Sequence, residues 1–307
     1  MKKLILIDGN AVIHRAFHGL PPTFRTPEGE LVNAVYGFSS ILLNILNVEK
    51  PEYIAVSFDL AKKTFRHEEY KEYKATRKKA PDELYAQFAR VKEVVKAFQI
   101  PIYEIEGFEA DDVLGTLAKQ AEKKEDIMTY IFTGDMDILQ LVTERTNAMT
   151  PTKGLQPPKV YTPEEVVKKW GLKPSQVVDM KGLQGDSSDN IKGVPGIGPK
   201  TAQTLLQKYG DLEGIYKHLD KINGSVHDKL EKDKESAFFS RRLATIVTDV
   251  PMTLDLEECK THEYDQDKIA ELFLSLNFKS LLGRLTAFNN HSDTQKIEDS
   301  PTQQSLF

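Results

Sequence analysis

The sequence predicts an α/β fold in which helices flank a mostly parallel central sheet. Three short apolar runs have the length and composition of buried strands: LILI (4–7), YIAVSF (53–58) and MTYIF (128–132). They alternate with helical patterns over 33–48, 82–98 and 110–124. Such alternation is typical of a parallel sheet covered on both faces. The segment IPIYEI (100–105) predicts a further strand.

The pattern changes after about residue 162. Thr162, Pro163 and Glu165 form a helix start, with Thr162 as the N-cap, Pro163 at the first helical position and Glu165 closing a capping box. From there to about residue 285 nearly all patterns are helical, whereas the final segment is polar and aperiodic. We therefore predict an α/β domain over 1–162, an α-helical domain over 163–285 and a flexible tail over 286–307.

Composition limits the class of protein. Hydrophobic residues make up 40% of the chain, enough for a buried core, and the single cysteine, Cys259, excludes an internal disulfide and a cysteine zinc cluster. The apolar run at 4–7 is too short for a secretory signal, and no stretch approaches a membrane span. We expect a cytoplasmic protein. The net charge of −5 disfavours a nucleic-acid binder, but segment 62–79 has a local charge of +5.

Acidic residues recur where the predicted strands end and where one helix begins. Their positions are Asp8, Asp59, Asp135 and Asp137 after strands, Glu109, Asp111 and Asp112 in EADD, and Asp186 and Asp189 in GDSSDN. Each cluster has an ordinary structural alternative: a turn aspartate, an acid complementing a helix dipole, or an Asx-rich loop. Because the carboxyl ends of parallel strands share one edge of a sheet, we expect the clusters to converge there.

Nine carboxylates in one cleft cannot all ionise without cations. Oxygen ligands alone, with no His or Cys in these motifs, favour Mg²⁺ or Mn²⁺ over zinc. Two such ions would stabilise the attacking and leaving oxygens of a phosphoryl displacement. Without these nine charges, the rest of the chain has a net charge of +4, which suits a metal-dependent nuclease.

Five ordered motifs resemble the 5′ nuclease family, and most of all the N-terminal 5′→3′ exonuclease domain of bacterial DNA polymerase I. They are LIDGN, SFD…TFRHEEYKEYKATR, EGFEADDVLGTLA, FTGDMDILQL and GLQGDSSDNIKGVPGIGPKTA. The resemblance covers about residues 2–285. It implies an α/β core with a helical arch over about 62–90, a helix–hairpin–helix-type module around 193–202, and Mg²⁺-dependent cleavage of 5′ flaps and of nicked or gapped DNA, in primer removal and repair.

The resemblance also implies residue roles. Asp8, Asp59, Glu109 and Asp111 would hold one ion. Asp135, Asp137, Asp186 and Asp189 would hold a second, assisted by Asp112. Lys74 and Arg77 would contact the scissile phosphate, and the other expected DNA contacts are Arg15, Arg66, Tyr73, Lys200 and Thr201. The main chain of Val194 and Ile197 would bind K⁺. We note that Lys74 and Arg77 have the spacing of one helical turn.

Other functions remain open from the residues alone. A catalytically silent DNA-junction binder would not need the complete carboxylate set, and a PIN-type ribonuclease would not need the helical module. A haloacid-dehalogenase-like enzyme would need Asp where Asn10 stands, and no phosphate-binding P-loop motif is present. Because polymerase I continues beyond its nuclease domain whereas this sequence ends at Phe307, we expect no polymerase activity. We also expect a monomer, acting on flaps that include RNA-primed ends.

The last five residues, QQSLF (303–307), resemble the bacterial sliding-clamp-binding peptide. In that peptide Gln303 would make polar contacts, and Leu306 and Phe307 would fill an apolar pocket. Gln304 departs from the pattern, in which Leu is usual. A flexible linker would tether the nuclease to the clamp and raise its concentration at primer junctions.

Overall fold

The computed structural model describes residues 1–152 and 157–285. The chain forms two compact units. The sheet unit comprises Met1–Val12, Glu52–Ala80 and Pro101–Lys260. The helical unit comprises Ile13–Pro51, Pro81–Ile100 and the chain from Thr261 onward. Both units therefore contain separate stretches of the sequence.

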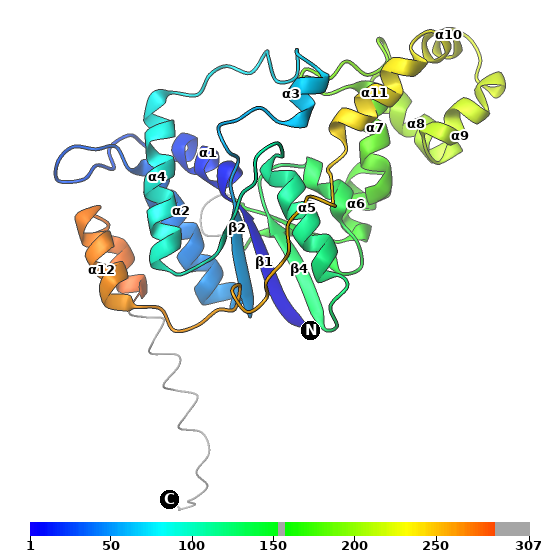
Figure 1. Ribbon diagram of the computed structural model, residues 1–307. Coiled ribbons are helices and arrows are strands. Elements are labelled where there is room, and N and C mark those ends of the chain that lie inside the picture. Colours follow the sequence, from blue (N-terminus) through cyan, green and yellow to red (C-terminus); the bar gives the residue numbers. More distant parts are fainter. Residues whose placement is uncertain (153–156, 286–307) are drawn as a thin grey trace, which may run out of the picture. The chain divides into compact units, whose positions relative to one another are not determined.

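A six-stranded sheet forms the centre of the sheet unit, in the order β3-β2-β1-β4-β5-β6. The strands are β1 (Lys2–Asp8), β2 (Tyr53–Ser57), β3 (Ile102–Tyr103), β4 (Ile127–Phe132), β5 (Thr146–Thr150) and β6 (Lys159–Tyr161). All neighbours pair in parallel except β5 and β6. Figure 1 shows β1 between β2 and β4. The mostly parallel sheet predicted from the sequence is confirmed.

Helices account for most of the remaining described residues. The sheet unit contains α3 (Phe65–Glu69), α5 (Ala110–Ala121), η2 (Asp137–Leu141), α6 (Pro163–Trp170), η3 (Pro174–Gln176), α7 (Val177–Gln184), α8 (Pro199–Tyr209), α9 (Leu212–Lys217), η4 (Leu219–Lys221), α10 (Ser225–Lys232) and α11 (Lys234–Ala244). The helical unit contains α2 (Asn33–Asn44), η1 (Ile45–Glu49), α4 (Asp82–Ala97) and α12 (Gln266–Ser275). Helix α1 (Gly9–Gly19) begins directly after β1.

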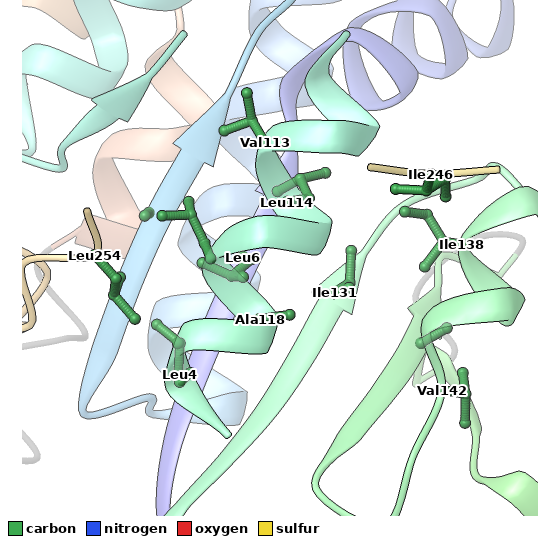
Figure 2. Close-up of a cluster of buried hydrophobic side chains, with 14 of the residues drawn as sticks. Leu4, Leu6, Val113, Leu114, Ala118, Ile131, Ile138, Val142, Ile246 and Leu254 are labelled. Atoms are coloured by element: carbon green, nitrogen blue, oxygen red, sulfur yellow. The ribbon is translucent and has the colours of Figure 1, made fainter. Parts of the chain in front are cut away.

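The apolar face of α5 packs on the sheet. Val113, Leu114 and Ala118 belong to the same cluster of buried side chains as Leu4 and Leu6 of β1 (Figure 2). All five side chains are almost fully buried. Because removing this apolar surface from water is favourable, the packing fixes where α5 begins relative to the strand ends. The start of α5 carries the EADD acids, so this core positions part of the candidate site.

The element boundaries differ from the sequence prediction in several places. Only Ile102–Tyr103 of the predicted strand 100–105 pairs with β2. The helix predicted over 33–48 ends as α2 at Asn44 and continues as the π-helix η1. Strands β5 and β6 and helix α1 were not predicted.

The predicted N-cap at Thr162 is confirmed, but the predicted capping box is not present, because the Glu165 side chain pairs with Lys159 and Lys168. The Thr162 side chain accepts a hydrogen bond from the Glu165 N–H at 3.4 Å, and Pro163 occupies the first helical position. The predicted tail over 286–307 lies outside the described residues. The linear division of the chain at residues 162 and 285 stays a prediction.

Within the described residues, no helix combines the length and the apolar character that a membrane crossing requires.

Gln87 of α4 supplies the N-terminal hydrogen bonds of α2. Its amide oxygen accepts from the N–H groups of Ala34 and Val35 at 2.8 and 3.3 Å, and its NH₂ group donates to Asn33 and to the Glu83 carbonyl, both at 3.1 Å. Gln87 is fully buried. Since the α2 N-cap residue makes no side-chain cap, one glutamine satisfies donors that would otherwise have no partner.

We expect Gln87→Met to lower the free energy of unfolding by about 2–3 kcal/mol, because it leaves buried N–H groups without an acceptor while keeping the side-chain length. Urea denaturation of the full chain measures the change. Ala89→Met, at an exposed position of the same helix, is the matched control. Equal stability of the two variants would contradict this role.

Candidate functional site

Three aspartates gather at the carboxyl edge of the sheet, as the sequence predicted. Asp8 is the last residue of β1, Asp59 follows β2, and Asp135 follows β4. Thr133, the residue directly after β4, donates its hydroxyl to Asp8 at 2.7 Å and so links the ends of β1 and β4. The order of the sheet reverses at β1, and ligands of open α/β sheets bind outside such a point.

Asp8 is held in a buried, hydrogen-bonded position. The exposed fraction of the residue is 4%, and its second oxygen accepts from the Ala11 N–H at 2.9 Å. Burial raises the pKa of Asp8 from 3.8 to about 6; the two hydrogen bonds lower it, and the nearby charges of Asp59 and Asp135 add to the rise. Two hydrogen bonds thus orient the Asp8 carboxylate, although burial makes its ionised form unfavourable.

Asp59 joins the end of β2 to the start of α5. One oxygen accepts from the Ala110 N–H at 2.6 Å, and the other accepts from the Asn10 amide at 2.8 Å. Asn10 in turn accepts from the Asp59 N–H at 3.1 Å. Burial is the main cause of the raised pKa of Asp59. Sequence reasoning did not identify Asn10 as a support for this carboxylate.

Asp111, in the first turn of α5, is the most strongly affected acid of the group. Burial raises its pKa well above the usual value, and the next causes are the charges of Asp8, Asp135, Asp59 and Glu109. Because the charges of four other carboxylates act on Asp111, it must lie close to them. The predicted convergence of the strand-end acids with Glu109 and Asp111 is therefore present in the structure.

A second group of acids surrounds Lys181. The ammonium of Lys181, on α7, forms ion pairs with Asp137 and Asp186. Burial and the Asp135 charge raise the pKa of Asp137 to about 6, against the opposing effect of Lys181. Burial also disfavours the Asp186 anion, but hydrogen bonds from Lys181 and Ser188 hold its pKa at about 2. Sequence reasoning missed Lys181, because nothing in its local pattern distinguishes it from a surface lysine.

Cations from the 62–79 segment contact Glu109 and Asp189. The Lys74 ammonium lies 2.8 Å from a Glu109 oxygen, and Arg77 forms an ion pair with Asp189. The Tyr73 hydroxyl lies between the two acids, 3.1 Å from Glu109 and 2.9 Å from Asp189. The structure therefore brings these three residues of the basic segment into contact with two of the predicted metal ligands, whereas their predicted DNA contacts stay predictions.

The backbone around Lys74 differs from the helical spacing that we considered. Residues 71–77 form turns, and Lys74 has a φ of +56° in the left-handed region. The bond from the Arg77 N–H to the Lys74 carbonyl, at 3.0 Å, spans three residues. The Lys74 N–H donates to the Asp189 carbonyl at 3.0 Å, so a backbone contact holds the turn in place. Asp186 and Asp189 likewise lie in a loop, where the Ser188 N–H donates to Asp186 at 2.8 Å.

Arg66 and Asp112 have a different place from the predicted one. Arg66 donates two parallel hydrogen bonds, of 2.7 and 2.8 Å, to Asp112, and both residues are buried. Asp112 also accepts from the N–H groups of Glu109 and Val247 at 3.1 and 2.8 Å. Because both Asp112 oxygens accept hydrogen bonds and both residues are buried, we interpret this pair as part of the fold. It leaves Arg66 no free donor face for DNA and Asp112 no free oxygen for an ion.

Across residues 1–152 and 157–285, no three His, Cys, Asp or Glu side chains stand in an arrangement that could hold a metal ion as they are placed. The protein's own cations occupy several of the oxygens instead: Lys74, Arg77 and Lys181 pair with Glu109, Asp189, Asp137 and Asp186. The donor set nevertheless fits a divalent cation. It consists of carboxylates alone, and burial and mutual repulsion keep several of them from ionising without one.

The hairpin at 193–202 begins with a tight turn. Gly193 and Gly196 have φ values of +64° and +83°, a region that glycine adopts without strain. Val194 and Ile197 are buried, and the Val194 carbonyl accepts from the Ile197 N–H at 3.0 Å.

Three groups of predicted contact residues remain to be described. Lys200 and Thr201 lie in the first turn of α8, where Lys200 is exposed. Arg15 is an exposed residue of α1 within the helical unit. The predicted clamp residues Gln303, Leu306 and Phe307 lie outside the described residues.

Two family models together match most of the chain. Residues 3–171 match the model described as the N-terminal resolvase-like domain of 5′-3′ exonuclease, and residues 172–267 match its C-terminal SAM fold. The DNA polymerase I of Bacillus subtilis (strain 168) is 43% identical over 300 residues, which cover 97% of this chain and 34% of the polymerase. That of Caldicellulosiruptor bescii is 46% identical over 285 residues, covering 92% and 33%. The chain thus spans about a third of the length of these relatives.

Solved structures of nucleases share the fold. The T5 5′-exonuclease with bound divalent metal ions (zinc) has a TM-score of 0.66 at 20% identity, with 94% of this chain and 99% of that chain covered. The catalytic core of Rad2 in complex with DNA substrate has a TM-score of 0.59 at 16% identity, with 94% and 92% covered. At these identities the likeness shows the fold alone.

The raised pKa of Asp8 predicts how stability depends on pH without metal. Between about pH 4 and pH 6 the folded protein retains a proton that the unfolded chain has released, so this residue makes the free energy of unfolding fall as pH rises through that window. From pH 4 to pH 7, we expect the free energy of unfolding of the natural chain to fall by about 2–3 kcal/mol relative to that of Asp8→Asn. Denaturant titrations in EDTA measure it, and parallel pH curves for the two proteins would contradict the buried, protonated state of Asp8.

Proposed function

The chain belongs to the 5′-3′ exonuclease family, and we propose that it hydrolyses phosphodiester bonds near the 5′ ends of DNA, as a 5′→3′ exonuclease and 5′ flap endonuclease that depends on divalent metal ions. The observation that carries this proposal is the group of buried carboxylates around Asp111 at the carboxyl edge of the sheet. Such a group is costly to build unless it meets a cation, and it lies where open α/β sheets bind ligands.

The carboxylates would hold two ions, of Mg²⁺ or Mn²⁺. Asp8, Asp59, Glu109 and Asp111 would hold one; Asp135, Asp137, Asp186 and Asp189 would hold the other. When bound, the ions would neutralise charge that develops on the phosphoryl group. The chain's own part is to orient the oxygens: Thr133 and Ala11 fix Asp8, and Asn10 and Ala110 fix Asp59. The bound divalent ions of the T5 5′-exonuclease structure support this proposal.

The residues of the 71–77 segment would bind the scissile phosphate. Lys74 and Arg77 now neutralise Glu109 and Asp189, with side chains 21% and 49% exposed. A substrate phosphate beside these acids would offer the same cations a new anionic partner. Preorganised cations that meet charge developing in the transition state lower the barrier, which gives Lys74 and Arg77 catalytic roles and Tyr73 a positioning role.

The hairpin would bind the duplex part of the substrate. Lys200, Thr201 and the N–H groups at the start of α8 would contact backbone phosphates, because a helix N-terminus favours anions. The carbonyls of Val194 and Ile197 would bind K⁺. The DNA substrate in the Rad2 structure supports the assignment of this fold to DNA binding.

The remaining parts of the proposal concern the cellular setting. We assign the chain to primer removal and repair in the bacterial cytoplasm, at the nucleoid, as a monomer that accepts RNA-primed 5′ ends. Gln303, Leu306 and Phe307 would engage a sliding clamp, as the likeness of QQSLF to clamp-binding peptides implies.

Cleavage of labelled 5′ flap, nicked and blunt duplex substrates tests the proposed function. We expect Mg²⁺-dependent cutting of the flap and the nick that EDTA abolishes. Asp135→Ala should remove cleavage while leaving DNA binding, because Asp135 acts through the ion. Failure of the natural chain to cut any of these substrates in Mg²⁺ or Mn²⁺ would leave DNA-junction binding without catalysis. Cutting of single-stranded RNA alone would favour a PIN-type ribonuclease.

We expect Lys74→Ala to lower the turnover number on flap DNA by about 10²–10³, the scale of losing one preorganised electrostatic contact. The affinity for the flap should change much less. Lys78→Ala, an exposed lysine of the same basic segment, is the matched control. Should saturating substrate restore the turnover of Lys74→Ala, the residue is a docking charge rather than a catalytic one.

A further inference from the structure

Lys181 lies where an internal cation is least expected. It projects from α7, the residue is only 7% exposed, and its ammonium pairs with Asp137 of η2 and with Asp186 of the following loop. Removing an ammonium from water costs several kcal/mol unless good partners surround it. The two carboxylates supply these partners, so the three groups form one buried unit.

Further hydrogen bonds fix the two acids of this unit beside Lys181. The other oxygen of Asp186 accepts from the N–H and the hydroxyl of Ser188, at 2.8 and 2.6 Å. The Asp137 N–H donates to Asp135 at 2.9 Å, which ties the unit to the strand-end acids. Lys181 therefore occupies the position between two acids where a divalent cation would have its ligands.

At the other end of the cluster the cation is more exposed: Lys74, which pairs with Glu109, has a side chain that is 21% exposed, against 9% for Lys181. Among the described residues, no Lys or Arg forms an ion pair with Asp8, Asp59 or Asp111. The strongest charges acting on Asp111 are carboxylates. The cluster thus has two unlike ends: at one, a partly exposed lysine pairs with a single acid, and at the other, the buried Lys181 pairs with two.

We propose that the Lys181 ammonium acts as an internal counter-ion. It occupies the site of the second divalent ion in the metal-free protein and must move away when that ion binds. The inference rests on the proposed function. One oxygen of each acid cannot hold the ammonium and a divalent ion together, so Lys181 lowers the affinity of the second site. In the metal-free protein it keeps the 186–190 loop docked beside η2. Lys181 is then a positioning residue that makes the two ion sites unequal.

Mn²⁺ binding to the full chain without DNA tests the inference. Electron paramagnetic resonance of free Mn²⁺ counts the ions bound at each concentration. We expect one tight and one weak site in the natural chain, and a second site at least about ten-fold tighter in Lys181→Met, because a like charge has left the ion's surroundings. Lys181→Arg keeps the charge and should leave the second site weak. Lys119→Met, which removes an exposed lysine paired with Glu122 at 3.4 Å, is the matched control.

Thermal unfolding of the same variants separates a counter-ion from a purely structural tie. In EDTA, Lys181→Met should melt below the natural chain, since Asp137 and Asp186 lose their shared cation. Saturating Mn²⁺ should remove that difference. If Lys181→Met does not fold in EDTA, its folding on addition of Mn²⁺ would equally support the counter-ion role.

Three outcomes would overturn the inference: unchanged Mn²⁺ affinity in Lys181→Met, an equal loss of stability with and without Mn²⁺, or a natural chain that binds no second ion. Flap cleavage by the natural chain is scored separately. A chain that cleaves flaps, but whose Lys181→Met variant binds Mn²⁺ unchanged, would retain the proposed function and lose this inference.

Discussion

Repulsion among buried carboxylates is the constraint on which the sheet unit depends. Burial makes Asp8, Asp111 and Asp137 costly to ionise, and each neighbouring acid adds to that cost. A chain can hold such a group together only with protons, internal cations or bound ions. The structure uses the first two, through raised pKa values and through Lys74, Arg77 and Lys181. Divalent cations suit this group of acids because they would replace both the bound protons and the lysine and arginine side chains.

The topology brings the acids together, and the core keeps them together. Because β1 lies between β2 and β4, the residues that follow these three strands meet at one edge. Helix α5 packs on the same sheet through Val113 and Leu114, so its first turn is fixed relative to the strand ends. Hydrogen bonds then connect the parts directly, from Thr133 to Asp8 and from Ala110 to Asp59. A rigid apolar layer thus supports a polar edge that would otherwise spread apart.

The sequence predicted what depends on local pattern. The strand-end acids and the Thr162 cap follow from apolar runs and helix signals, which a short window contains. The pairing of Arg66 with Asp112 and of Lys181 with Asp137 joins residues 46 and 44 positions apart, so no window shows it. The left-handed turn at Lys74 is fixed by the Asp189 carbonyl, which is also distant in sequence. Strand β5 escaped prediction because its sequence, TNAMT, is polar although every residue is buried.

The lysine and arginine side chains that pair with these acids differ in how readily they could leave their carboxylate partners. The Arg66 side chain is 4% exposed and is bound through two parallel bonds to Asp112, which makes it a fixed part of the fold. Lys181 is slightly more exposed, at 9%, whereas Lys74 and Arg77 reach 21% and 49%. The cost of breaking the ion pair decreases in the same order, because a more exposed partner left behind can be hydrated by water. The proposed phosphate contacts are therefore the cations that the fold holds least firmly, and the proposed counter-ion is one that only a competing cation at the same oxygens would displace.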